Sequence, residues 1–258
     1  MMKIKDFELL SNTKITEDYF VLDLLSPDIL PEILPGQFVQ LRVDNDRNTF
    51  LRRPVSVYDI DYETNTIRLL IKKVGKGTRA MSRLIAGQKV NLVYPLGNSF
   101  SLDAGGKKSL LVGGGVGVAP LMLLARMMKQ RSFDFKLLLG YQSAEHIVEK
   151  DRYALFGDVL ICTEDGSQGF KGLLTVHPEL LADDYDRIYC CGPELMMKAV
   201  AAIALAKNKF CEVSLENTMA CGYGVCLCCV AETHRGNVCT CTEGPVFNIN
   251  ELKWQTLG

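Results

Sequence analysis

The sequence predicts an α+β multidomain protein: an antiparallel β-barrel, an α/β domain with a parallel sheet, and a small C-terminal segment. We place these parts at residues 1–98, 99–215 and 216–258. Three observations support this division. Short β-rich runs separated by turns fill the first part. Apolar strands alternate with helical patterns in the second. Seven of the ten cysteines fall between Cys211 and Cys241.

The bulk composition is that of an ordinary globular protein, with 48% hydrophobic and 23% charged residues in a chain of 258. A formal net charge of −1 gives no reason to expect nucleic acid or an acidic membrane surface as a partner. The longest apolar stretch, residues 110–125, is interrupted by glycines and Pro120, so we expect no membrane span. The N-terminus lacks the apolar core of a secretory signal, which predicts a cytoplasmic location.

The first part shows the alternating pattern of half-buried strands. Residues 36–43 place Val39, Leu41 and Val43 on one face, and residues 66–72 and 90–94 alternate in the same way. Many short strands of this kind favour a closed antiparallel barrel, which also removes exposed sheet edges.

Two clusters in this part have the chemistry of a ligand site. Arg53-Pro54-Val55-Ser56 places an arginine, which can hold a diphosphate through two parallel hydrogen bonds, close to a hydroxyl that can reach a polar ring edge. Gly77-Thr78 stands at a helix start, where free N–H groups and a hydroxyl can bind an anion. Either cluster alone fits a strand salt bridge or an ordinary helix cap, but their joint occurrence favours binding.

The second part predicts a nucleotide-binding parallel sheet. We expect strands at residues 109–113, 135–141, 159–163, 187–191 and 211–215. A turn containing Gly113, Gly114, Gly115 and Gly117 separates the first strand from a helix over residues 121–128. This arrangement is typical of a pyrophosphate site, although it also fits a tight turn that needs positive φ.

A second loop of this domain, Cys191-Gly192-Pro193, ends one strand and opens a helix that runs through Lys207. Loops at the carboxyl ends of parallel strands face the ligand crevice. After the strand over residues 135–141 the chain reads Ser143-Ala144-Glu145 and has no arginine before Arg152. Because a ribose 2′-phosphate requires a cation, this favours NAD over NADP.

The cysteines of the third part indicate a metal centre. Cys221, Cys226 and Cys229 have the C-x4-C-x2-C spacing of a plant-type 2Fe–2S site, which needs a fourth thiolate. Cys241 is the first candidate for it and Cys239 the second. A structural zinc site is the alternative, although zinc ribbons favour two short knuckles. In reducing surroundings, disulfides are disfavoured.

The order of these motifs over the first 215 residues resembles the ferredoxin–NADP reductase superfamily. The resemblance implies that Arg53 and Ser56 hold FAD, that Gly77-Thr78 binds its diphosphate, and that the second domain binds a pyridine nucleotide. We expect Leu70, Ile71 and Lys72 to contact the FAD as well. Many members have an aromatic residue where this chain has Val55, so the residue that stacks on the flavin is left open.

The cysteine pattern and the stretch from Cys241 to Phe247 are similar to the electron-transfer subunit family of dihydroorotate dehydrogenase B. That resemblance favours Cys241 over Cys239 as the fourth ligand. It implies a partner subunit that contains FMN and oxidises dihydroorotate, in a heterotetramer of two of each. Electrons would pass from FMN through the 2Fe–2S cluster and FAD to NAD in pyrimidine (UMP) biosynthesis.

Two alternatives remain at this point. The same cofactor set serves FAD/2Fe–2S subunits of electron-bifurcating transhydrogenases and hydrogenases. A zinc-stabilised binding module without a redox role would also retain the cysteines.

Overall fold

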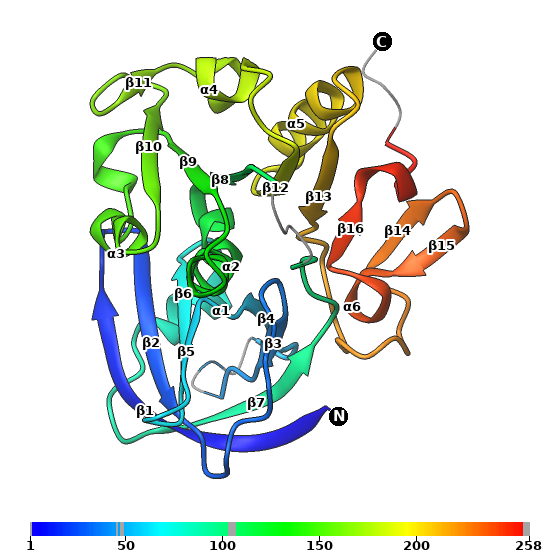
Figure 1. Cartoon of the computed structure of the whole chain (residues 1–258). Coiled ribbons are helices and arrows are strands. Elements are labelled where there is room, and N and C mark those ends of the chain that lie inside the picture. Colours follow the sequence, from blue (N-terminus) through cyan, green and yellow to red (C-terminus); the bar gives the residue numbers. More distant parts are fainter. Residues whose placement is uncertain (1, 45, 47–48, 103–106, 255–258) are drawn as a thin grey trace.

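The computed structural model describes residues 2–44, 46, 49–102 and 107–254. An antiparallel sheet occupies the lower left of Figure 1, a parallel sheet with helices lies above it, and the C-terminal segment lies to the right. This arrangement confirms the predicted α+β multidomain class. No helix in the described ranges has both the length and the apolar character needed to cross a membrane.

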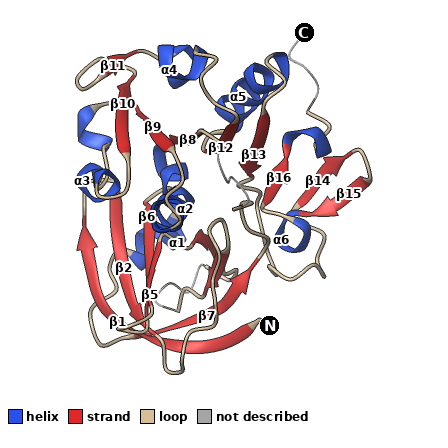
Figure 2. Cartoon of the chain, in the orientation of Figure 1, coloured by secondary structure: helices blue, strands red, loops and turns tan. Residues whose placement is uncertain are grey.

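The N-terminal sheet has seven antiparallel strands in the order β4-β3-β7-β1-β2-β6-β5. It curls on itself (Figure 2), but no ladder of described residues joins its edge strands β4 and β5 into the closed barrel that the sequence predicts. The strands predicted around residues 39, 66 and 90 are present as β3, β6 and β7. Its elements are β1 (Lys3–Lys14), β2 (Tyr19–Leu25), β3 (Phe38–Leu41), β4 (Arg53–Ser56), β5 (Asp59–Asp61), β6 (Thr66–Lys72), α1 (Lys76–Met81) and β7 (Lys89–Leu96).

The second sheet has the order β11-β10-β9-β8-β12-β13-β16, and its first six strands are parallel. All five predicted strands are present to within one residue at each end. The strands are β8 (Ser109–Gly114), β9 (Phe135–Tyr141), β10 (Asp158–Thr163), β11 (Phe170–Lys171), β12 (Arg187–Cys191) and β13 (Phe210–Ser214). The helices are η1 (Gly115–Val118), α2 (Ala119–Gln130), η2 (Ala144–His146), α3 (Lys150–Ala154), η3 (Leu174–Val176), α4 (Pro178–Leu181) and α5 (Glu194–Ala206).

The C-terminal segment is tied to the parallel sheet. It contains the hairpin β14 (Val230–Thr233) and β15 (Gly236–Cys239), then α6 (Thr240–Glu243), β16 (Val246–Asn248) and η4 (Ile249–Glu251). Strand β16 pairs antiparallel with β13, with Val213 opposite Phe247. The segment is therefore built into the edge of the sheet.

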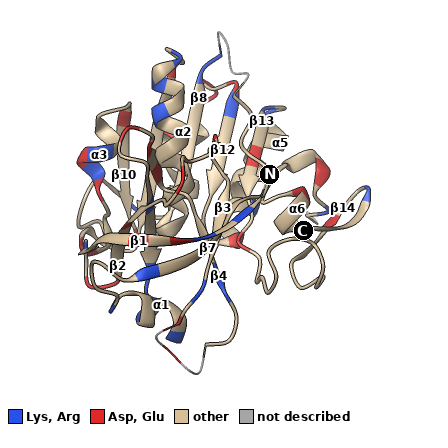
Figure 3. Ribbon diagram, turned by 90° about the horizontal axis from the view of Figure 1, so that it is seen from below, with Lys and Arg blue, Asp and Glu red and all other residues tan. Residues whose placement is uncertain are grey.

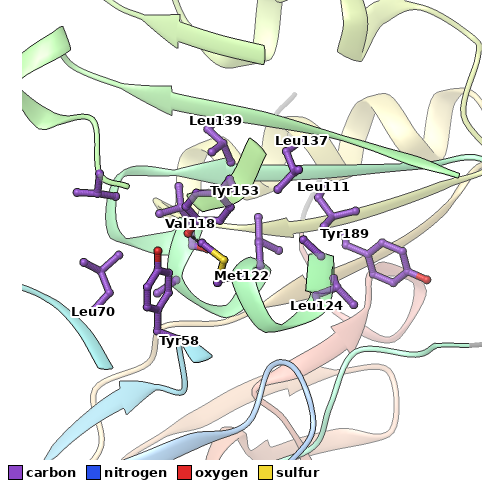
Figure 4. Packing of buried hydrophobic residues seen from close by; sticks show 14 of the residues in the cluster. Tyr58, Leu70, Leu111, Val118, Met122, Leu124, Leu137, Leu139, Tyr153 and Tyr189 are labelled. Atoms are coloured by element: carbon purple, nitrogen blue, oxygen red, sulfur yellow. Dashed lines mark hydrogen bonds between the residues drawn. The ribbon is translucent and has the colours of Figure 1, made fainter. Parts of the chain in front are cut away.

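A common hydrophobic core joins the two sheets. Tyr58 and Leu70 of the N-terminal part pack with Val118, Met122 and Tyr153 of the α/β part (Figure 4). The Tyr153 hydroxyl donates a hydrogen bond of 2.9 Å to the Val118 carbonyl oxygen. Burial of this many large side chains disfavours separation of the two parts.

Buried ion pairs cross the same boundary. The carboxylate of Asp59 on β5 is only 4% exposed, and it pairs with Arg126 of α2 at 2.8 Å and with Arg152 of α3. Arg68 of β6 pairs with Glu149, just before α3, at 2.9 Å. These directional contacts fix the orientation of the α/β part on the N-terminal sheet.

We predict that Asp59→Ala lowers the free energy of unfolding by about 3 kcal/mol, because it leaves two partly buried guanidinium groups without their counter-charge. Chemical denaturation measures the loss. Glu8→Ala is the matched control: it removes an exposed pair with Lys89 and should cost less than about 1 kcal/mol. Equal losses in the two variants would contradict the role assigned to Asp59.

Candidate functional site

A cavity of about 240 Å³ lies where the three parts of the chain meet. Strands β4 and β6 and helix α1 form one side, the start of α2 forms another, and the chain after β13 closes it. Most of the residues predicted for FAD line this cavity: Pro54, Val55, Ser56, Leu70, Ile71, Lys72 and Thr78. It is also lined by residues that the sequence did not single out, among them Phe38, Glu216, Met219 and Pro245.

The two remaining residues predicted for FAD, Arg53 and Gly77, are in contact with each other. A Cβ atom added at Gly77 would lie 2.8 Å from Nε of Arg53, so a larger residue there would force the Arg53 side chain to move. The Thr78 hydroxyl accepts hydrogen bonds from the N–H groups of Val74 and Gly75, which fixes the turn. Figure 3 shows basic residues on and around β4 and α1, a setting that suits a diphosphate.

A larger crevice, of about 490 Å³, lies at the carboxyl ends of the parallel strands. Gly114, Gly115 and Pro193 of the predicted nucleotide site line it. It meets the smaller cavity at Lys72, which lines both. The Lys72 ammonium group also lies 5.5 Å from the centre of the Tyr19 ring. A ligand in the crevice can therefore reach a ligand in the smaller cavity.

The glycines of the two loops allow the backbones to pack directly together. An added Cβ at Gly117 would lie 2.4 Å from Cα of Gly192 and 2.5 Å from the Cys191 carbonyl oxygen. One at Gly114 would lie 2.5 Å from the sulfur of Met196, and one at Gly113 would clash with Val118. The sequence alternatively predicts a turn that needs a residue with positive φ. Gly115 is such a residue, with a φ of +55°. Gly113, Gly117, Cys191 and Gly192 do not line the crevice themselves; they pack the two loops together behind the residues that do.

The predicted cysteine ligands come together in pairs. The thiol of Cys221 lies beside that of Cys226, and the thiol of Cys241 lies beside that of Cys229. Cys239 also contacts Cys229. In the part of the chain that the structure describes, no three His, Cys, Asp or Glu side chains form a group able to hold a single metal ion. A 2Fe–2S cluster needs two ligands at each of its two irons, so four cysteines arranged as two pairs would suit it.

Backbone amides of the cysteine loop point at these sulfurs. The N–H of Gly224 donates to the sulfur of Cys241 at 3.1 Å, and the N–H of Tyr223 donates to Cys221 at 3.4 Å. Burial alone would raise the pKa of Cys221, but hydrogen bonds from Tyr223 and Cys226 lower it to about 6. Burial raises the pKa of Cys241 to about 12, so an iron bound there has to displace its proton.

A thin apolar wall separates the cysteines from the smaller cavity. Phe38 and Met219 line that cavity, and both pack in one cluster with Cys229 and Cys241. No sequence pattern indicates this role, because a buried apolar residue is normally a core residue. The wall places the cysteine site within side-chain contact of the cavity.

Comparisons with known proteins first define the class. Residues 6–100 match the oxidoreductase FAD-binding domain, and residues 216–253 match the iron–sulfur cluster binding domain of dihydroorotate dehydrogenase B. The ferredoxin reductase in carbazole 1,9a-dioxygenase shares the fold, with a TM-score of 0.70 at 23% identity over 81% of this chain and 67% of that one. The chain thus combines an oxidoreductase FAD-binding domain and an iron–sulfur cluster binding domain on the fold of a ferredoxin reductase.

The curated relatives identify the family. The dihydroorotate dehydrogenase B (NAD(+)) electron transfer subunit of Fusobacterium nucleatum is 34% identical over 98% of this chain and 99% of its own. That of Clostridium acetobutylicum is 40% identical over 86% of this chain and 87% of its own. The chain belongs to this family of electron transfer subunits, which confirms the predicted resemblance and the cofactor set of FAD, an iron–sulfur cluster and NAD.

This chain is also similar to a solved structure of a protein that is described in a different reaction. The NADH-dependent reduced ferredoxin-NADP oxidoreductase, described in relation to flavin-based electron bifurcation, has a TM-score of 0.86 at 31% identity. It covers 97% of this chain and 91% of that chain. The arrangement of the three parts is therefore shared with a protein described in a different reaction.

We predict that Gly117→Ala raises the KM for NADH about 10-fold or more, because the added methyl group forces the two crevice loops apart. Steady-state reduction of an artificial dye by NADH measures this effect. The control is Gly87→Ala: its φ of +86° strains the backbone of any replacement, but nothing lies within 4 Å of the added Cβ, so it reports a loss of stability without a change at the crevice. An unchanged KM in Gly117→Ala would show that the loops do not shape the nucleotide site.

Proposed function

We propose that the chain is the electron-transfer subunit of an NAD-dependent dihydroorotate dehydrogenase, acting in pyrimidine (UMP) biosynthesis. In this proposal, electrons from the FMN of a partner subunit pass through a 2Fe–2S cluster and FAD to NAD. The observation that carries it is the contiguity of the three sites. Lys72 lines both the smaller cavity and the crevice, while Phe38 and Met219 separate that cavity from the cysteines.

The smaller cavity is the proposed flavin site. Arg53 and Gly77-Thr78 would hold the diphosphate, Ser56 would hydrogen bond a polar edge of the ring, and residues 70–72 would line its face. Val55 is too small to stack on a flavin as an aromatic residue does. Phe38, opposite Ser56 in the β3–β4 ladder, is the aromatic side chain of this cavity instead.

The crevice is the proposed NAD site. The Gly113–Gly117 turn and the Cys191-Gly192-Pro193 loop would position the coenzyme so that its nicotinamide meets the flavin near Lys72. Bound FAD supplies the conversion between the hydride chemistry of NAD and the single-electron chemistry of the cluster. Tyr19 and Lys72 shield this junction on the side of the N-terminal sheet.

Cys221, Cys226, Cys229 and Cys241 are the proposed cluster ligands. The closeness of the thiols supports this set. Cys239 also lies beside Cys229, so the Gly224 N–H that donates to the sulfur of Cys241 is the contact that supports Cys241 over Cys239. Cys228 is exposed and stays a bystander in this proposal. The tip of the loop exposes Tyr223, Val225 and Leu227 around Cys226, so a partner protein can approach the cluster there.

The partner we propose is an FMN-containing catalytic subunit, with two copies of each subunit in the complex. The relatives are named as electron transfer subunits, which implies a separate catalytic subunit. Co-purification with an FMN protein that supports dihydroorotate-dependent reduction of NAD tests this assignment.

A subunit of an electron-bifurcating enzyme is the second candidate, favoured by the similarity to the reduced ferredoxin-NADP oxidoreductase structure. The two candidates require different partners. Co-purification with a ferredoxin-coupled flavoprotein, together with inactivity towards dihydroorotate, would favour the second.

We predict that Cys226→Ser abolishes the visible absorbance of the cluster and electron transfer to the partner. Reduction of dyes by NADH should survive, because this path needs only the NAD and FAD sites. Cys228→Ser is the matched control and should retain both activities, since its thiol lies in the same loop but outside the proposed ligand set. Full coupled turnover in Cys226→Ser would show that the ligand assignment is wrong.

We further predict about two irons and two acid-labile sulfides per chain in protein purified without oxygen. A zinc-stabilised module would instead contain about one zinc and no sulfide. Elemental analysis combined with a sulfide assay separates these outcomes.

A further inference from the structure

One buried amide beside the cysteine loop is not explained by the fold. Gln40 lies in the middle of β3 with an exposed fraction of 0%. Neither its Nε2 nor its Oε1 atom has a hydrogen-bond partner among the described residues. A buried amide without partners destabilises a folded protein, so such groups usually face a ligand or a bound water.

The Gln40 side chain extends to the first predicted cluster ligand. A Cβ added at Gly222, which directly follows Cys221, would lie 2.5 Å from Cγ of Gln40 and 2.9 Å from its Nε2. The amide nitrogen therefore packs against the backbone that carries Cys221. The positive φ of Gly222, +81°, lets the loop turn at this contact.

The orientation of β3 also indicates that the Gln40 side chain points towards the cysteines. Residues two apart on a strand point to the same face, so Gln40 shares its face with Phe38. Phe38 packs against Cys229 and Cys241. The Gln40 carbonyl oxygen already accepts a hydrogen bond from Nη1 of Arg52 at 3.2 Å, so only the side-chain amide is left to be satisfied.

We infer that the Gln40 amide donates a hydrogen bond to a sulfur of the iron–sulfur site and thereby raises the reduction potential of the cluster. Hydrogen bonds to cluster sulfurs stabilise the added negative charge of the reduced state. Gln40 is a positioning residue of the electron path, because it acts through the cluster. This inference rests on the cluster site proposed above.

The test is a redox titration of the purified complex, in which the electron paramagnetic resonance signal of the reduced cluster is followed. Gln40→Leu removes the donor at similar volume, and we expect the cluster midpoint potential to become more negative while that of FAD is unchanged. Gln40→Glu, which cannot donate when ionised and adds negative charge, should shift it further in the same direction. If leucine does not fit, Gln40→Met removes the donor with an unbranched side chain.

Gln37→Leu is the matched control. Gln37 is only three residues away, and its side chain is already hydrogen bonded to the Gly97 carbonyl oxygen and the Leu34 N–H. Its replacement should leave the cluster potential unchanged. A wild-type potential in both Gln40→Leu and Gln40→Glu would overturn the inference, and a water would then be the partner of the amide. A wild-type complex without any reduced-cluster signal would instead overturn the cluster site itself, and the inference with it.

Discussion

The antiparallel pairing of β16 with β13 is the interaction on which the arrangement of the three sites depends. It holds the C-terminal segment against the edge of the parallel sheet, where three backbone positions of each strand are in register. Pro245, directly before β16, reaches the smaller cavity, and Cys241 packs against Phe38 of the N-terminal sheet. Without this pairing, the cysteine loop would lose its backbone attachment to the parallel sheet, and side-chain packing such as that in the cluster of Phe38, Met219, Cys229 and Cys241 would have to hold it beside the smaller cavity.

Most of the fold could be predicted from the sequence, because its parts have strong local signals. The five predicted strands of the parallel sheet are apolar runs bounded by turns, and the glycine-rich turn before α2 is needed for the close approach of Gly117 to Gly192. Two features could not be predicted. The three residues of β16 are too few to show a period, and the open edges of the N-terminal sheet depend on long-range pairing.

The residues of the candidate site also fall into two groups: those that the sequence identifies and those that only the structure reveals. Arg53, Ser56, Gly77 and the cysteines are identifiable because their chemistry and spacing are unusual. Phe38 and Met219 are not, since their position between a cavity and a thiol pair comes only from tertiary packing. Gln40 is an intermediate case. In the sequence, a glutamine on a strand does not indicate a functional residue. Gln40 is identified as a candidate only because its side chain is completely buried and has no hydrogen-bond partner among the described residues.

The similarity to a reduced ferredoxin-NADP oxidoreductase bears on how specificity arises. Two chains with a TM-score of 0.86 share one arrangement of their parts although they are described in different reactions. The fold therefore sets the order and spacing of the sites, while the reaction depends on which partner binds to its surface. The exposed apolar residues Tyr223, Val225 and Leu227 surround Cys226 and belong to the loop that also carries Cys221. If the proposed ligands and the proposed partner surface are correct, they share one short loop, so a change to the partner surface would also act on the cluster.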